Sequence, residues 1–215
     1  MSSCAIFDLD GTIIDYSSEQ VFLKYLLKEG ELPMSNLLDW TSYFLKTQDL
    51  RKAKAYKMYL HGLDYQRVCN LAETCFKERL VDRISPRVLD LMAFHRSEGR
   101  TIVILSGSLQ VLVYLFHNYL ETDLMIGYEL ETVDGFITGH QVGLNPHAEN
   151  KALLVKELTK TYAFNLADSY AYGNHHSDAH KLRLVGHPVA VNPDRKLRRI
   201  AMENGWQIEQ FHVKT

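Results

Sequence analysis

The chain has 215 residues, with 24 lysines and arginines against 26 aspartates and glutamates, and a formal net charge of −2. This length suffices for one large domain, or for a core domain with a small insertion. The near-neutral balance offers no electrostatic basis for binding nucleic acid, so an anionic substrate must be held by local positive groups.

Membrane and export signals are also missing from the pattern. No apolar run has the length that a bilayer span needs, and the first residues lack the charged and apolar regions of a signal peptide. The three cysteines form neither a disulfide framework nor a CxxC metal pattern. We therefore expect a cytoplasmic protein that has no membrane partner.

The chain opens with a short apolar run, Ala5–Phe7, which is followed by Asp8, Asp10 and Gly11. The run predicts a buried strand, and residues two apart on a regular strand would aim both carboxylates the same way. Gly11 interrupts the strand and lets the backbone approach a ligand closely. Two carboxylates at a strand end beside a glycine turn suit Mg²⁺ and a phosphate group. The alternative is that both aspartates are ordinary turn residues.

The next block, residues 15–84, is predicted to be helical throughout. A first helix begins near Ser17 and ends at Gly30, and apolar stripes at helical spacing continue through 33–83 with a break at 62–64. No strand pattern interrupts the block. Because it follows directly on the first strand, it has the character of an inserted helical unit.

After residue 84, strands alternate with helices. Expected helices cover 86–99, 109–116, 149–162, 177–184 and 194–204, expected strands cover 101–105, 124–127, 170–173, 188–191 and 206–211, and a hairpin is expected over 131–144. The hairpin rests on the Asp134-Gly135 pair. The alternation predicts an α/β fold, a Rossmann-like three-layer α/β/α parallel sheet. Ligands bind such sheets beyond the carboxyl ends of the strands.

A second strand-end signal is Ser106-Gly107-Ser108, predicted as a turn between a buried strand and a helix. The hydroxyl of Ser106 together with amides at the start of the helix would form an anion site. Ser108 is equally compatible with a plain helix cap.

Lys151 stands near the start of the helix that follows the hairpin. An aspartate that must face a phosphate dianion needs a fixed positive charge beside it, and the position of Lys151 in the chain order suits that role. Isolated lysines are otherwise residues of a solvated face, as we expect for Lys156 and Lys160.

The third strand end carries Gly173-Asn174, with Asp178 four residues further on. A carboxylate at this spacing could reach back to a metal ion or to Lys151. A zinc site is the alternative here, since His176 and His180 have the four-residue spacing of helical metal pairs and His175 precedes them. The glutamate of an HExxH motif is absent between them.

Taken in order, Asp8-x-Asp10-Gly-Thr, Ser106, Lys151 and Gly173-Asn174 to Asp178 resemble the four motifs of the haloacid dehalogenase-like (HAD) phosphatases. The chain is most similar to the phosphoserine-phosphatase-like branch, subfamily IB, which carries a helical cap between the first strand and the second motif. The resemblance spans nearly the whole sequence. It implies an α/β core domain over 1–14 and 85–215 and an all-helical cap domain over 15–84.

The resemblance also implies the chemistry of a Mg²⁺-dependent phosphomonoesterase. Asp8 attacks phosphorus and forms an aspartyl-phosphate, while Asp10 serves as general acid and base. Mg²⁺ and Lys151 screen the repulsion between the carboxylate and the dianion. The phosphoryl oxygens are held by Leu9, Ser106, Gly107 and Ser108. The metal ligands come from Asp8, Asp10, Asn174 and Asp178. The substrate is a small phosphate ester, and the protein is a monomer or homodimer.

Three departures from the branch bear on metal and substrate. Asn174 stands where many members have aspartate, which removes one formal charge and weakens metal binding unless Asp178 becomes a ligand. Ser17 occupies the place of a substrate-reading glutamate, and the segment 54–57 has no arginine. These differences do not favour phosphoserine as the substrate. Phosphotransfer to another acceptor and a non-catalytic binding module stay open as alternatives, whereas dehalogenation has no use for Asp10 and a metal.

Overall fold

The computed structural model describes residues 2–47 and 57–211. Its strands are β1 (Cys4–Phe7), β2 (Thr101–Leu109), β3 (Leu124–Tyr128), β4 (Leu130–Val133), β5 (Phe136–Gln141), β6 (Tyr170–Gly173), β7 (His187–Val191) and β8 (Gln207–Glu209). Its α-helices are α1 (Ser18–Lys28), α2 (Met34–Thr47), α4 (Tyr65–Cys75), α5 (Pro86–Ser97), α6 (Gln110–Leu120), α7 (Glu149–Tyr162), α8 (Ala179–Leu182) and α9 (Arg195–Glu203). Short 3-10 or π turns lie at Met58–Leu60, Phe76–Leu80, Val81–Arg83, Leu166–Asp168 and His176–Asp178.

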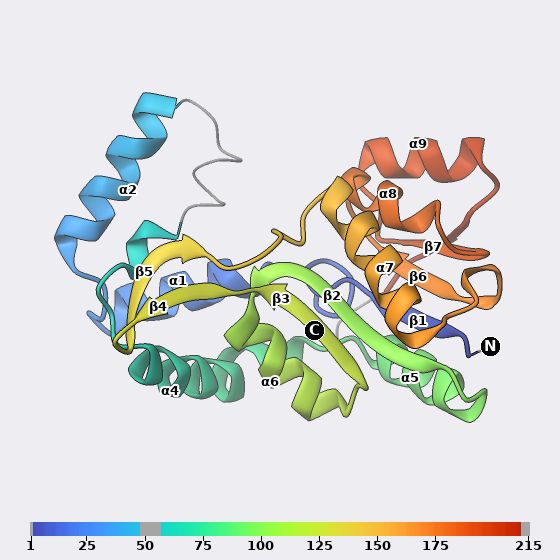
Figure 1. Ribbon diagram of the computed structural model, residues 1–215, viewed down its shortest axis with the longest axis horizontal. Coiled ribbons are helices and arrows are strands. Elements are labelled where there is room, and N and C mark those ends of the chain that lie inside the picture. Colours follow the sequence, from blue (N-terminus) through green and yellow to red (C-terminus); the bar gives the residue numbers. More distant parts are fainter. Residues whose placement is uncertain (1, 48–56, 212–215) are drawn as a thin grey trace.

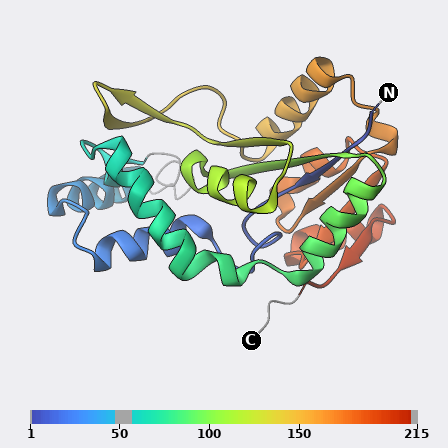
Figure 2. The ribbon, with the colours of Figure 1, turned by 90° about the horizontal axis from the view of Figure 1, so that it is seen from below.

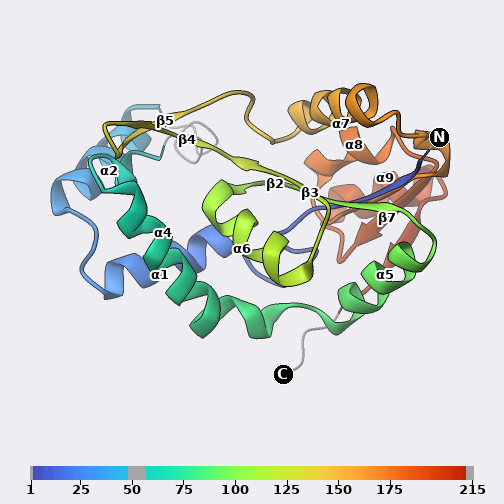
Figure 3. The ribbon, with the colours of Figure 1, turned by 60° about the horizontal axis from the view of Figure 1, so that its bottom comes forward.

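Six parallel strands form the main sheet in the order β3-β2-β1-β6-β7-β8. Side chains of β1 alternate between its two faces: Ala5 and Phe7 join one buried cluster, and Cys4 and Ile6 join the other. Helices α5 and α6 cover the first face, and α7, α8 and α9 cover the second (Figure 3). The predicted three-layer α/β/α fold is confirmed.

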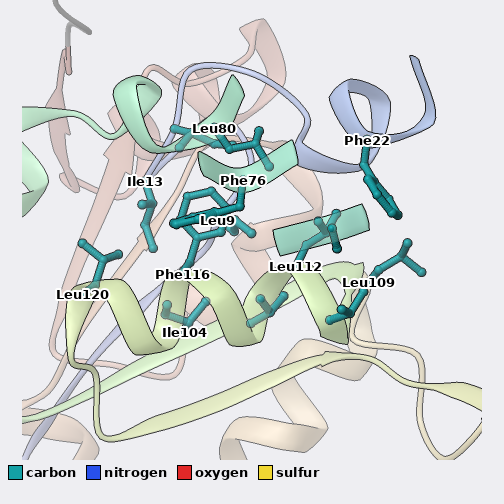
Figure 4. Packing of buried hydrophobic residues seen from close by; sticks show 14 of the residues in the cluster. Leu9, Ile13, Phe22, Phe76, Leu80, Ile104, Leu109, Leu112, Phe116 and Leu120 are labelled. Atoms are coloured by element: carbon teal, nitrogen blue, oxygen red, sulfur yellow. The ribbon is translucent and has the colours of Figure 1, made fainter. Parts of the chain in front are cut away.

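The segment 15–84, here called the cap segment, joins the rest of the molecule through one continuous apolar core. Figure 4 shows Phe76 of this segment against Phe116 of α6, with Phe22 and Leu80 in the same cluster of buried side chains. The Phe76 and Phe116 rings meet edge to face with their centroids 4.9 Å apart, a favourable arrangement for two buried aromatic rings. The core therefore extends without a break from the sheet into the cap segment.

The predicted hairpin forms as β4 and β5, and Asp134 and Gly135 both have positive φ, as a type I′ turn requires. It lies beside the cap segment in the views of Figures 1 and 2. Backbone hydrogen bonds run from Lys57 N to Gly139 O (3.2 Å) and from Gly62 N to Ile137 O (2.7 Å). The hairpin thus lies along one side of the cap segment and is hydrogen-bonded to it.

Among the strand and helix boundaries that differ from the sequence predictions, two lie at the carboxyl end of the central strands. Strand β1 ends at Phe7, so Asp8 and Asp10 lie in a turn and do not share a strand face. Strand β2 runs on to Leu109, so Ser106-Gly107-Ser108 is extended strand and not a turn before a helix. Pairing of Leu109 with Tyr128 of β3, beyond a shift in register, keeps this end of β2 in the sheet.

The two ends of the cap segment lie side by side. An antiparallel bridge joins Ile14 to Ile84, and Ser85 N donates to Ile13 O at 3.0 Å. The assignment of 1–14 and 85–215 as one domain and 15–84 as another stays a prediction. Among the described residues, no helix combines the length and apolar character that crossing a membrane requires.

Candidate active site

The sequence-predicted residues meet at the carboxyl ends of the central strands β1, β2 and β6. On either side of β1 the strand order runs in opposite directions, which is where doubly wound sheets bind their ligands. Asp8 follows β1 directly, and its N–H donates to Tyr172 O of β6 at 3.1 Å. This bond fixes the backbone of Asp8 next to the strand that leads into Asn174.

A buried ionic cluster surrounds Asp8. Lys151 Nζ lies 2.8 Å from Asp8 Oδ1 and 2.8 Å from Asp178 Oδ1, so one ammonium group bridges two carboxylates. Only 7% of Asp8 and 4% of Lys151 is exposed. Burial alone would lower the pKa of Lys151, but the two carboxylates outweigh it and raise that pKa. Lys151 is therefore a fixed cation.

The two aspartates of this cluster differ in how their charge is stabilised. Asp178 Oδ2 accepts the backbone N–H groups of Asn174 and His175, both at 3.2 Å. Burial opposes the charge of Asp178, yet the neighbouring lysines and these bonds lower its pKa. Burial and the nearby Asp178 charge instead raise the pKa of Asp8. Gly173 makes the arrangement possible, since a Cβ there would lie 2.7 Å from the Asp178 Cβ.

Asp10 faces a different set of partners, supplied by α1 and β2. Ser18 N donates to its Oδ1 (2.9 Å), and the Ser108 hydroxyl donates to its Oδ2 (2.7 Å). Burial raises the pKa of Asp10 to about 6, even though both bonds favour its charged form. A carboxyl group with this pKa exchanges its proton near neutral pH, as a general acid and base must.

The predicted phosphate-binding residues lie around the same strand ends, but their hydrogen bonds and secondary structure differ from the prediction. The Leu9 N–H donates to the Asp8 side chain at 2.9 Å. Ser106 Oγ accepts from Ser108 N at 3.2 Å, and Gly107 continues β2 between them. Ser108 caps no helix, because its hydroxyl is directed to Asp10. Helix α6 begins only at Gln110, so its first amides do not follow Ser106 directly.

The Asn174 side chain lies against Gly11, in the loop that carries Asp8 and Asp10. A Cβ on Gly11 would lie 1.9 Å from Asn174 Nδ2, and the φ of Gly11 is +76°. A cavity of about 310 Å³ opens here, lined by Asp10, Gly11, Asn174 and the first residues of the cap segment. Only glycine at position 11 leaves room for this amide side chain beside the loop.

The histidines that suggested zinc are arranged differently from the predicted helical pair. His175 and His176 gather with Asp194, and this group does not include His180. Asp194 already accepts from Leu197 N, His176 N and His176 Nδ1 at 2.6, 3.1 and 2.8 Å. Asp194 therefore caps the first turn of α9 and binds the loop at His176, so the position of these three residues is explained without a zinc ion.

A polar cluster in the cap segment was not foreseen. Lys57 Nζ contacts both carboxylate oxygens of Glu19 (2.5 and 2.7 Å), and the Tyr59 hydroxyl donates to Glu19 Oε1 (2.7 Å). The ammonium group also lies 5.0 Å from the centre of the Tyr128 ring. Ser17 caps α1 by accepting from Gln20 N. Residues 54–56, which the sequence singled out together with Lys57, lie outside the described part of the chain.

A second buried lysine was also missed. Lys181 is 0% exposed, and its Nζ lies 3.3 Å from Asp178 Oδ1. Burial lowers the pKa of Lys181 against the attraction of Asp178. The three-residue spacing from Asp178 places both residues on one helical face, and this was the available sequence signal.

The sequence profile of the haloacid dehalogenase-like hydrolases matches residues 5–183. The chain belongs to this family. Phosphoserine phosphatase SerB1 of Mycobacterium tuberculosis is 28% identical over 99% of this chain and 72% of its own length. The histidinol-phosphatase of Neisseria meningitidis is 30% identical over 98% of this chain and all of its own. A solved phosphoserine phosphatase with a phospho-aspartyl intermediate analogue superposes with a TM-score of 0.65 at 18% identity, covering 96% of this chain and 92% of that one.

The family profile and the two curated relatives identify this HAD protein as a phosphatase that is similar to phosphoserine phosphatases. The family resemblance drawn from the four ordered motifs is confirmed. The structural neighbour supports the fold.

Proposed function

We propose that this HAD phosphatase is a Mg²⁺-dependent phosphomonoesterase that hydrolyses a small phosphorylated metabolite through an aspartyl-phosphate on Asp8. The observation that carries the proposal is the pairing of Asp8 with the buried Lys151 at 2.8 Å, beside Asp10, whose pKa is about 6. One carboxylate is placed next to a fixed cation, and a second is poised to exchange a proton. This division of roles suits a two-step phosphoryl transfer.

The residues at the strand ends fit Mg²⁺, which prefers oxygen ligands. Asp8, the main-chain carbonyl of Asp10 and the Asn174 amide would supply them. Both oxygens of Asp178 are engaged, Oδ1 by Lys151 and Oδ2 by backbone N–H groups. We therefore assign direct ligation to Asn174, and to Asp178 the role of holding Lys151. The bound ion would offset negative charge on the phosphoryl oxygens.

The steps then follow from the chain's own groups. Lys151 reduces the repulsion between Asp8 and the substrate dianion, so that a carboxylate oxygen of Asp8 can attack phosphorus. Protonated Asp10 gives its proton to the departing alcohol oxygen. As a carboxylate, Asp10 next takes a proton from the water that hydrolyses the aspartyl-phosphate. The bonds from Ser18 and Ser108 keep the Asp10 carboxyl group oriented through both steps.

The substrate side of the site faces the cap segment. Glu19 follows Ser18, the residue that holds Asp10, and is itself held by Lys57 and Tyr59. Two relatives are named as a phosphoserine phosphatase and a histidinol-phosphatase, so phosphoserine and histidinol phosphate are the first esters to compare. Because Lys57 already neutralises Glu19, we expect no strong dependence on a substrate ammonium group.

The test is phosphate release from p-nitrophenyl phosphate and a panel of small phosphomonoesters, with Mg²⁺ and with a chelator, for the wild type and Asp8→Asn. We expect metal-dependent release that is lost in the variant. Release unchanged in Asp8→Asn would refute the proposal. Formation of new phosphate esters when alcohols are added would instead identify a phosphotransferase on the same core.

A further inference from the structure

We propose that Lys181 is a positioning residue for phosphoryl transfer: it neutralises Asp178 and thereby leaves the charge of Lys151 available to Asp8 and the phosphoryl group. The inference rests on the proposed function, in which Asp8 is the nucleophile. It assigns a role to a buried cation that none of the four motifs contains. Lys181 does not contact the reacting atoms and acts on them only through Asp178 and Lys151.

The geometry places two ammonium groups on one carboxylate oxygen. Asp178 Oδ1 lies 2.8 Å from Lys151 Nζ and 3.3 Å from Lys181 Nζ. Lys151 Nζ is at the same time 2.8 Å from Asp8 Oδ1. Lys151 is therefore shared between two carboxylates, whereas the only ion pair of Lys181 among the described residues is with Asp178.

Charge balance gives this arrangement a consequence. Without Lys181, the buried carboxylates of Asp8 and Asp178 would share one ammonium group, and these side chains alone would carry a net negative charge beside the place where a dianion binds. With Lys181, the two carboxylates and two ammonium groups balance before the substrate arrives. The two cations also repel each other, so Lys181 weakens the hold of Asp178 on Lys151.

A purely structural role fits Lys181 poorly. Its side chain is 0% exposed, and its Nζ makes no hydrogen bond of regular geometry with any residue in 2–47 or 57–211. A buried ammonium group in this state is costly for folding, and an apolar side chain of similar length would fill the space without that cost. Asp178 keeps all three of its hydrogen-bond donors without Lys181, namely Lys151, Asn174 and His175.

The experiment compares Lys181→Met with the wild type in the full chain. Steady-state kcat and KM are measured with p-nitrophenyl phosphate at saturating Mg²⁺, and the unfolding midpoint is measured in parallel. Lys156→Met, an exposed lysine on α7, is the matched control. We expect kcat of Lys181→Met to fall by about tenfold or more, as removal of groups that support reactive residues commonly does, with an unfolding midpoint no lower than that of the wild type.

A second background tests the route through Asp178. In Asp178→Asn the carboxylate charge is gone, so adding Lys181→Met should change kcat by less than about threefold. A kcat within about twofold of the wild type for Lys181→Met alone would overturn the inference. So would a loss of kcat that is the same in both backgrounds. Either result leaves the proposed function intact as long as wild-type turnover still depends on Asp8.

Discussion

Replacing Gly11 by alanine perturbs the metal side of the site through one added atom. The new Cβ would lie 1.9 Å from Asn174 Nδ2 and 2.6 Å from Asn174 Cγ, so the amide side chain must move away. The backbone at φ +76° adds strain of about 1–2 kcal/mol for any residue with a Cβ. The fold should survive, because the obstructing atoms belong to a side chain that can rotate.

The matched control is Gly99→Ala. Gly99 has a φ of +69° and nothing within 4 Å of its added Cβ, so it carries the backbone strain without the contact. Both variants should lose about 2–8 °C in Tm. We expect only Gly11→Ala to need more Mg²⁺ for half-maximal phosphatase activity, by about tenfold or more. Equal Mg²⁺ requirements in the two variants would refute the placement of Asn174 as a metal ligand.

Three further outcomes follow from the site and its surroundings. Burial, and secondarily the charge of Arg100, lowers the pKa of His95 to about 4, so the folded state favours neutral imidazole. The contribution of neutral His95 to the unfolding free energy is therefore fully present above pH 6.5 and is lost as the pH falls to 4, a change of about 3 kcal/mol. In His95→Gln the unfolding free energy should fall less steeply across that range. Ser108→Ala removes a bond to the charged form of Asp10, so the limb of the pH–rate profile that reports Asp10 should move to higher pH; an unmoved limb would contradict this role. Lys57→Met should lower the unfolding free energy by about 3 kcal/mol, because it leaves the largely buried Glu19 without its cation. The control Lys77→Met, in an exposed i,i+4 pair, should lower it by under about 0.5 kcal/mol. Equal losses in denaturant titrations of the two variants would contradict this reasoning.

The layers of the fold follow from local sequence because buried parallel strands are apolar runs and their helices repeat at 3.6 residues. Helix α7 has the bounds that its pattern predicts, and the Asp134-Gly135 turn forms where its dipeptide indicates. The end of β2 did not follow from sequence. Ser106-Gly107-Ser108 has no apolar signal, and it stays in the sheet through pairing with β3, which is a tertiary effect.

The order of the motifs predicts which residues gather at the strand ends, but not which atoms meet. Ser108 and Asp10 are 98 positions apart, and Lys57 and Glu19 are 38 apart, so neither contact leaves a local pattern. Spacing alone cannot tell whether Asp178 is a metal ligand or a partner of Lys151. Its three hydrogen-bond donors in the folded chain, with the Lys181 ammonium group 3.3 Å away, are the basis on which we propose that it holds Lys151.

The most direct test of the central claim is chemical labelling of the intermediate. The protein is mixed with substrate and Mg²⁺ and quenched, the acyl phosphate is reduced with tritiated borohydride, and the labelled peptide is sequenced. The account predicts label at Asp8, dependent on substrate and absent from Asp8→Asn. Label at another residue, or rapid turnover with no labelled carboxylate, would contradict it.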